Sequence, residues 1–153
     1  MGEYIIHSGA VPKVSLLRGI GTIVLRVPWK VRAAACIAYF IFLTWILLAP
    51  APMVGKYCPK FQHADKVLHF LSFGGLVLLS RFSFPDPRHL TVPGWLVPAL
   101  ALVYGAAVDI TQGLLVQYQR SFEWTDIAAN GLGAASFWYL SGKLLAEAKS
   151  SRG

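Results

Sequence analysis

Charge is scarce in this sequence. Charged residues make up 14% of its 153 positions and hydrophobic residues 56%, whereas ordinary soluble domains carry roughly 25% charged residues. The mean hydropathy is correspondingly high, at +0.55. This composition argues against a soluble enzyme, a nucleic-acid module and a disordered regulator, and the length predicts a single domain.

Acidic residues are scarcer than basic ones. Seven Asp and Glu stand against fourteen Lys and Arg, which gives a net charge of +7. A basic excess can indicate nucleic-acid binding. Here, however, the charges lie at the edges of apolar blocks, where membrane proteins keep them. We therefore predict a membrane protein with no nucleic-acid partner.

Cysteines and common catalytic motifs are also few or absent. The two cysteines are Cys36 and Cys58, and the topology predicted below separates them by a membrane thickness, which is too far for a disulfide. The sequence contains no G-x-x-x-x-G-K-[ST], no G-x-G-x-x-G and no H-E-x-x-H motif. We predict no cofactor, and whether the protein catalyses any reaction stays open.

Four apolar blocks are present, and they cover residues 33–49, 65–84, 93–115 and 124–143. The first is long enough to cross ~30 Å of hydrocarbon, for which about 20 apolar residues suffice. The second has only 14 uncharged residues between Lys66 and Arg81, but it can span if these two side chains reach toward opposite interfaces. The blocks predict an all-α, polytopic membrane bundle of about four transmembrane helices.

The distribution of Lys and Arg predicts the orientation of this bundle. With four spans, ten of these residues fall on the side of the two termini and four on the other. The positive-inside rule then places both the N-terminus and the C-terminus in the cytoplasm, in a multi-pass protein of the cytoplasmic membrane. We divide the chain into a cytoplasmic arm (1–32), a membrane domain (33–146) and a cytoplasmic tail (147–153).

The arm has a helical apolar pattern with basic residues among it. Its apolar residues at this spacing are Leu16, Leu17, Ile20, Ile23 and Val24. A basic amphipathic helix on the anionic inner surface of the membrane fits this pattern. A loose arm is the alternative, because Gly19 and Gly21 weaken a helix.

Polar residues of the apolar blocks gather toward the predicted outer face. They are Asp65, Lys66, His69, Asp109, Gln112, Arg120, Asp126 and Asn130. Asp65 and His69, Asp109 and Gln112, and Asp126 and Asn130 are pairs three or four residues apart, so each pair shares one helix face. We predict a pocket that opens outward and is lined by three helices.

Asp109 is the member of this set that a structural role explains least. It lies about 10 Å below the predicted outer end of its helix, where a carboxylate is costly unless it faces the bundle interior and has a partner. The predicted partners are Lys66, Arg120 and His69. Acid–base chemistry by Asp109 and His69 is conceivable, because burial moves the pKa of such groups toward neutrality.

Structural roles compete with binding roles at the other positions. Asp65 and Asp126 stand at predicted helix starts, where acids cap free N–H groups. Asn130 lies beside Gly131 and Gly133, which suit close helix packing and an interhelical hydrogen bond. His63, Asp65 and His69 have a spacing that a metal could use, but further ligands are not evident, and no metal site is predicted.

The polar motifs resemble those of the VanZ-like membrane proteins. Asp65, Lys66 and His69 stand in D-K-V-L-H-F, similar to the family's D-K-x-x-H-F. The later motifs, D-I-T-Q and R-S-F-E-W-T-D-I-A-A-N-G-L-G, are similar to E-x-x-Q and R-x-x-x-x-x-D-x-x-x-N-x-x-G. Asp109 stands where the family has glutamate. The resemblance covers roughly residues 33–145.

The resemblance implies about four helices with the motif residues at the outer face. The founding member is associated with low-level resistance to teicoplanin-type lipoglycopeptides. We therefore expect a protein that binds or modifies a membrane lipid or another amphiphile of the cell envelope. The alternative is a non-catalytic accessory or assembly subunit, in which the polar residues brace the bundle and the partners are other membrane proteins.

Overall fold

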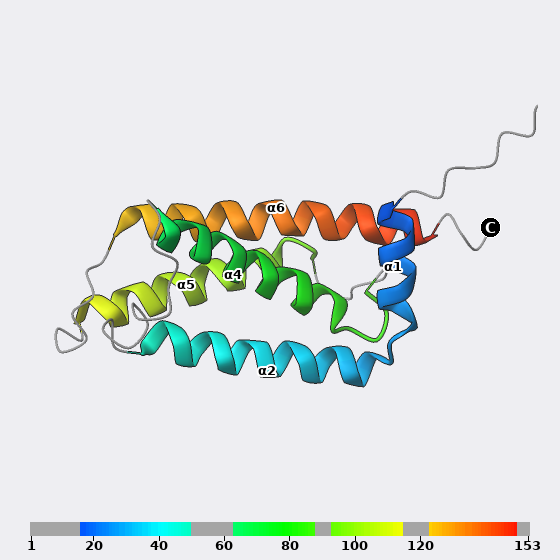
Figure 1. The fold of residues 1–153 in the computed structure, drawn as a ribbon, viewed down its shortest axis with the longest axis horizontal. Helices are drawn as coiled ribbons and strands as arrows, with labels where there is room; N and C mark the ends of the chain where they lie inside the picture. Colours follow the sequence, from blue (N-terminus) through cyan, green and yellow to red (C-terminus); the bar gives the residue numbers. More distant parts are fainter. Residues whose placement is uncertain (1–15, 50–62, 88–92, 115–122, 150–153) are drawn as a thin grey trace, which may run out of the picture.

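The computed structural model describes residues 16–49, 63–87, 93–114 and 123–149, and these ranges hold five α-helices and no strand. The helices are α1 (Leu16–Arg26), α2 (Trp29–Leu48), α4 (Ala64–Phe82), α5 (Leu96–Leu114) and α6 (Trp124–Lys149). The predicted all-α fold is confirmed for these residues. The four longer helices follow the long axis of the molecule, and α1 lies across one end of them (Figure 1).

Length and composition mark α2 and α5 as the two candidate membrane spans of the described residues. Core helices of soluble proteins and signal sequences can be equally long and apolar, so these two helices alone are a weak indication of membrane association. The four-span bundle, with α4 and α6 as further spans, stays a prediction. So does the cytoplasmic location of both termini.

The helix ends differ somewhat from the predicted blocks. α2 begins at Trp29, before the predicted start, because Pro28 has φ −53° and a proline is tolerated at a helix start. α5 begins at Leu96, after the predicted start. α6 continues to Lys149, past the predicted end, because the Ala, Glu and Lys residues near its end favour a helix.

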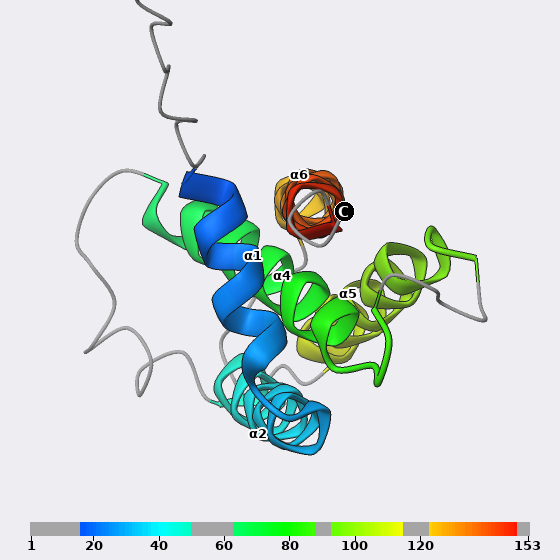
Figure 2. The same ribbon diagram turned by 90° about the vertical axis from the view of Figure 1, so that its right-hand side faces the viewer.

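The core lies around α4, which runs between α6 and α2 with α5 to one side (Figure 2). Its largest buried side chain is Phe73. The core cluster joins residues of four helices: Leu43, Leu47, Phe73, Leu76, Val77, Ala101, Val108 and Ala134. Because α4 contacts all three of the other long helices, it holds the bundle together.

Glycines set the closest approaches between α4 and α6. A Cβ added at Gly133 would overlap the carbonyl oxygen of Phe70, and one added at Gly74 would overlap the ring of Phe137. Gly131 is different, because its added Cβ would meet only a Leu102 methyl group at 3.4 Å, an ordinary contact. Gly133 therefore determines how closely α6 approaches α4, and Gly131 does not.

The N-terminal arm contains the helix that its apolar spacing predicts. α1 is well amphipathic, and its inner side packs on α4 and α6 in a second cluster around Phe82, Leu144 and Leu145. At the crossing with α6, the carbonyl oxygen of Leu144 would lie 2.5 Å from a Cβ at Gly21. Gly21 weakens the helix by itself but lets α1 approach α6.

Candidate functional site

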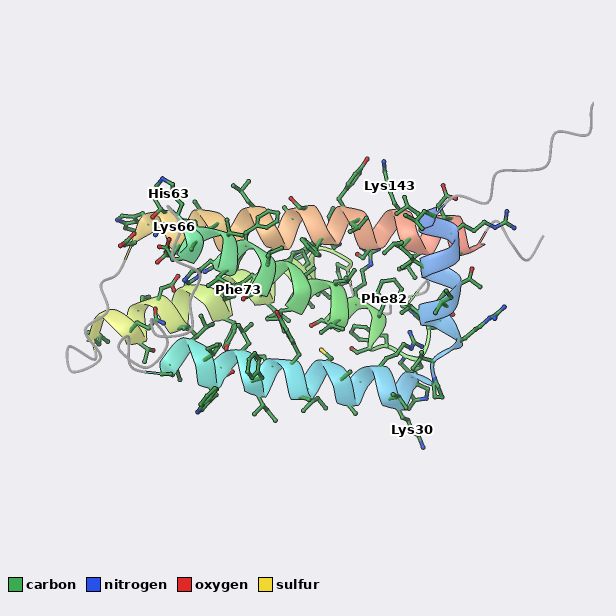
Figure 3. The ribbon with its side chains drawn as sticks, viewed as in Figure 1. Lys30, His63, Lys66, Phe73, Phe82 and Lys143 are labelled. Carbon is green, nitrogen blue, oxygen red and sulfur yellow. The ribbon has the colours of Figure 1, made fainter. Side chains whose placement is uncertain are left out.

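The predicted polar residues lie at the end of the bundle where α4 and α6 begin and α5 ends (Figure 1). His63 and Lys66 lie at this end, opposite Lys30 and Lys143 (Figure 3). We call the residues gathered there the polar end, and they are Asp65, Lys66, His69, Asp109, Glu123, Asp126 and Asn130. Arg120 lies outside the described residues.

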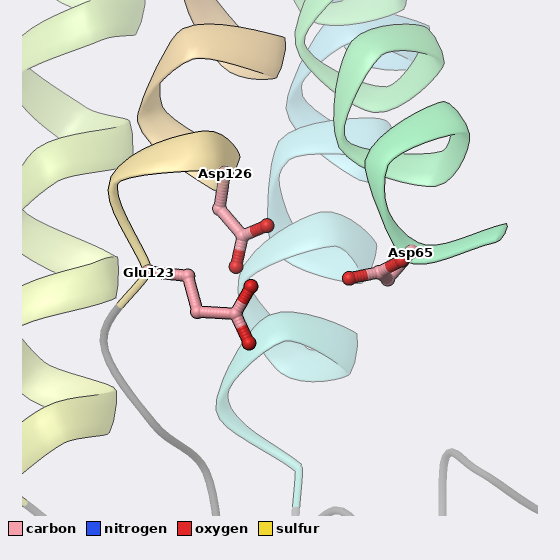
Figure 4. Close-up of side chains that lie close together, drawn as sticks. All are labelled: Asp65, Glu123 and Asp126. Carbon is pink, nitrogen blue, oxygen red and sulfur yellow. The ribbon is translucent and has the colours of Figure 1, made fainter. Parts of the chain in front are cut away.

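Lys66 is the centre of the outermost part of the polar end. Its Nζ lies 2.7 Å from Asp65 Oδ2, 2.6 Å from Glu123 Oε2 and 2.5 Å from Asp126 Oδ1. Figure 4 shows the three carboxylates turned toward one another from the starts of α4 and α6. This ammonium therefore ties the start of α4 to the start of α6.

The sequence reasoning missed Glu123, which precedes α6 directly. Its backbone carbonyl accepts the Asp126 N–H at 3.0 Å, and its carboxylate binds Lys66. The side-chain hydrogen bond from Lys66 lowers the pKa of Glu123 below its ordinary value. The sequence did contain a signal for Glu123. It is an acidic residue three positions before Asp126, and such spacing at a helix start brings two carboxylates together.

The three carboxylates also determine the charge that this region presents. With Asp65, Glu123 and Asp126 ionised around one ammonium, two negative charges are left over. Oxygens of the three carboxylates lie within 4.8 Å of one another, as metal ligands would. The ammonium of Lys66 occupies the position between them, so this group already has its cation.

The other metal spacing noted in the sequence does not form a cluster. His63 is exposed and has φ 62°, and its side chain does not cap α4. Asp65 forms an ion pair with Lys66, and His69 forms a hydrogen bond with Asn130.

His69 connects the outermost residues to the interior. Its Nδ1 lies 3.0 Å from Oδ1 of Asn130, and its Nε2 lies 3.9 Å from Oδ2 of Asp126. The first distance is a hydrogen bond and the second is too long for one. The imidazole also stacks on the Phe73 ring at 6.5 Å between centroids, so the core holds the ring in place.

Asp109 and Asn130 are the buried end of this path. Asp109 is 3% exposed and Asn130 is 1% exposed, and Nδ2 of Asn130 donates to Oδ2 of Asp109 at 3.3 Å. Because the Asn130 amide nitrogen faces Asp109, its carbonyl oxygen Oδ1 faces His69 and can only accept a hydrogen bond. Nδ1–H of His69 therefore donates to Oδ1 of Asn130. Among the described residues, the direct hydrogen-bond partner of Asp109 is thus Asn130, which was not among the partners predicted for it, and the predicted partner Arg120 lies outside them.

Gln112 does not join the polar end. It is buried, and its Nε2 donates to the carbonyl oxygen of Leu47 at 2.5 Å. That carbonyl belongs to the last turn of α2, where carbonyls lack helical partners. Gln112 therefore ties α5 to the end of α2, although it shares a helix face with Asp109 in the sequence pattern.

A cavity of about 250 Å³ lies in the other half of the bundle. Apolar side chains of α2, α4 and α5 line most of it, and Ser80, Ser83 and Tyr104 are the polar residues of its lining. Cys36 lies nearby, with Sγ 3.5 Å from Oγ of Ser80. None of the predicted pocket residues that the structure describes lines this cavity.

In comparisons with known proteins, no family model, no curated protein and no solved structure matches this chain.

Proposed function

We propose that the chain is a four-span, VanZ-like protein of the cytoplasmic membrane, with both termini in the cytoplasm, whose polar end binds the head group of a membrane lipid or another envelope amphiphile. Support for spanning comes first from α2 and α5, which are long and apolar enough. Large apolar side chains of α2 also point outward, and Ile41 is 62% exposed. Soluble monomers rarely expose large contiguous apolar surfaces.

The positions of the basic residues support the proposed orientation. Arg26, Lys30, Arg81 and Lys143 lie on the half of the bundle opposite Lys66. In α4, the 15 steps from Lys66 to Arg81 correspond to about 22 Å of helix. Long basic side chains can bridge the remaining distance to both interfaces.

The observation that carries the binding proposal is the path from the surface to Asp109. It runs from Lys66 to Asp126 at 2.5 Å, past His69 to Asn130 at 3.0 Å, and on to Asp109 at 3.3 Å. Buried carboxylates in membrane helices are costly and mark functional sites by default. A polar path that reaches such a carboxylate from the outer face is an arrangement that a head-group site requires.

The charge of the polar end indicates which head groups it favours. Asp65 and Glu123 are exposed, and the cluster has two negative charges in excess, so ammonium, amide and hydroxyl donors are favoured. Lys66 is held by carboxylates and is not available to bind an anion. We therefore expect Arg120, three positions before Glu123 in the chain, to bind any phosphate or carboxylate of the head group.

Resistance of a host cell to a teicoplanin-type lipoglycopeptide tests this proposal. We expect the wild-type chain to raise resistance and Asp109→Asn and Arg120→Gln each to abolish the gain, with equal protein in the membrane fraction. Asp86→Asn is the matched control, because it removes a carboxylate at the other end of α4. A double Asp109→Asn, Arg120→Gln variant that acts like the wild type would refute the proposal.

A second candidate function is a non-catalytic assembly subunit, with the polar end as an internal brace. One observation favours it, namely that Lys66, His69, Asn130 and Asp109 all bond to groups of the same chain. Purification in a mild detergent distinguishes the two functions. A stoichiometric membrane partner supports the subunit, whereas a single chain with bound amphiphile, detected by native mass spectrometry, supports head-group binding.

A further inference from the structure

α1 has apolar side chains on two sides, and within the described part of the chain only one of these sides is covered. Leu17, Val24 and Leu25 pack on α4 and α6. The uncovered residues are Leu16, Ile20 and Ile23 of α1 and Val27 directly after its end, and we call them the outer stripe. Leu16 is 79% exposed and Ile23 is 64% exposed. A helix of this kind needs an apolar surface on each side.

Basic residues accompany the outer stripe, and the sequence segment that contains it has no acidic residue. Arg26 and Lys30 are exposed, and Lys30 points away from the bundle (Figure 3). The sequence has no Asp or Glu between Glu3 and Asp65. The surface that covers the outer stripe should therefore combine apolar groups with negative charge.

The direction of α1 fits a flat surface at the end of the bundle. Figures 1 and 2 show α1 running crosswise to the long helices, from beside α6 over the end of α4 toward α2, and not along them. If the long helices cross a membrane, α1 then lies along its plane. An amphipathic helix in that position buries its apolar face at the boundary between head groups and acyl chains.

We propose that the outer stripe of α1 inserts into the cytoplasmic leaflet, with Arg26 and Lys30 at the level of anionic head groups, while the inner side stays packed on α4 and α6. The proposal rests on the spanning bundle proposed above. Basic residues near an anionic leaflet strengthen such binding. α1 thereby fixes the depth of the bundle at its cytoplasmic end.

A second copy of the chain is a poorer occupant for the outer stripe. α1 has eleven residues, which is about 16 Å of helix. A stripe of this length offers far less area than the roughly 800 Å² per partner of a stable interface. Two copies would also bring Arg26 and Lys30 of each chain close to those of the other, and the like charges would repel.

Spin labels on the full-length chain in lipid vesicles test the proposal. In a background with Cys36→Ala and Cys58→Ala, single labels are placed by Ile23→Cys on the outer stripe, Arg26→Cys as the matched position on the same helix, and Ile41→Cys on α2. Collision with oxygen reports lipid, and collision with a nickel chelate reports water. In phosphatidylcholine vesicles that contain phosphatidylglycerol, we expect an oxygen-to-nickel ratio several-fold higher at position 23 than at position 26.

The label on α2 separates failure of this inference from failure of the proposed function. If position 41 reports lipid and position 23 reports water, the bundle spans but the role of α1 is wrong. If position 41 also reports water, the spanning bundle itself is wrong. Spin–spin broadening at position 23 would instead identify a second copy and overturn the proposal.

Lipid charge tests the role of the basic residues. We expect the label at position 23 to lie deeper when phosphatidylglycerol is present than in phosphatidylcholine alone, and Arg26→Gln with Lys30→Gln to remove the difference. If the label at position 23 lies equally deep in both kinds of vesicle, anionic head groups do not strengthen the insertion of the outer stripe, and the role proposed for Arg26 and Lys30 is wrong.

Discussion

Replacing Lys66 by methionine should reverse the response of the protein to acid. Methionine keeps most of the side-chain length but removes the ammonium that lies 2.5–2.7 Å from three carboxylates. Asp126 is largely buried, with 15% of its side chain exposed. Leaving a largely buried charged acceptor without its donor costs about 1–3 kcal/mol. The melting temperature should fall by about 2–4 °C per kcal/mol for a chain of this length.

The pH dependence distinguishes a lost ion pair from a general loss of packing. In the wild type, Lys66 lowers the pKa of Glu123 below 4.5. A lowered pKa gives stability that is present above the ordinary value and is lost as the pH falls through the pKa of the folded state. Wild-type stability should therefore decrease on acidification below about pH 4.5.

The Lys66→Met variant should show the opposite slope. Without the ammonium, the neighbouring carboxylates repel one another and raise the pKa of Glu123, so protonation relieves the folded state. The variant should therefore become more stable as the pH falls toward the same range. Thermal melting in detergent micelles, followed by circular dichroism from pH 7 to about pH 3, measures both slopes.

Lys143→Met is the matched control for this experiment. It removes the same charge from an exposed side chain whose Nζ lies over the Tyr139 ring at 4.8 Å. Such an exposed contact contributes about 0.5–1 kcal/mol. In the described part of the chain no carboxylate cluster surrounds it, so the change of stability with pH should stay that of the wild type. If Lys66→Met melts with the wild-type slope, the cluster does not determine the charge balance of the polar end.

Three further predictions test the packing and the buried network, the first two by thermal melting and the third by proteolysis. Gly133→Ala should destabilise the protein by about 1–3 kcal/mol because its Cβ meets the Phe70 backbone. Its control, Gly131→Ala, should be neutral or stabilising by up to about 1 kcal/mol. Equal effects would contradict the conclusion that Gly133, and not Gly131, determines how closely α6 approaches α4. Asn130→Leu should cost about 1–3 kcal/mol because Asp109 loses its donor, and adding Asp109→Leu should recover part of that loss; a double variant less stable than the single one would contradict this account. Gly21→Ala should displace α1 from Leu144 and speed proteolytic cleavage within α1. Gly19→Ala is the control, because Gly19 has open space around it, and its cleavage rate should stay that of the wild type.

Local patterns were sufficient to predict the four long helices. Apolar blocks bounded by prolines and charges predicted α2, α4, α5 and α6, whereas helical spacing leaves α1 open between a helix and a loose arm. Each of these features acts within one segment, because a proline ends a helix wherever the rest of the chain lies. The sequence also placed the starts of α4 and α6 beside the end of α5, since antiparallel neighbours in a bundle alternate direction.

The partners within the polar end could not be predicted from the same patterns. Asp109 and Gln112 are three residues apart, which leaves about 60° between them on a helix. That angle is enough for Asp109 to face Asn130 while Gln112 faces Leu47 on α2. Which neighbour each side chain meets depends on how far the helix is rotated, and spacing within the helix does not contain that information.

Packing between helices supplies the missing rotation and register. Gly133 lets α6 approach the Phe70 backbone, and a Cβ at Gly105 would lie 2.8 Å from the Phe73 ring and 3.1 Å from Nδ2 of Asn130. These close approaches place Asn130 between His69 and Asp109 without any polar group at either glycine. The path from Lys66 to Asp109 is therefore a product of helix packing as much as of the polar residues themselves. A Gly133→Ala variant that keeps its polar residues should still disturb that path.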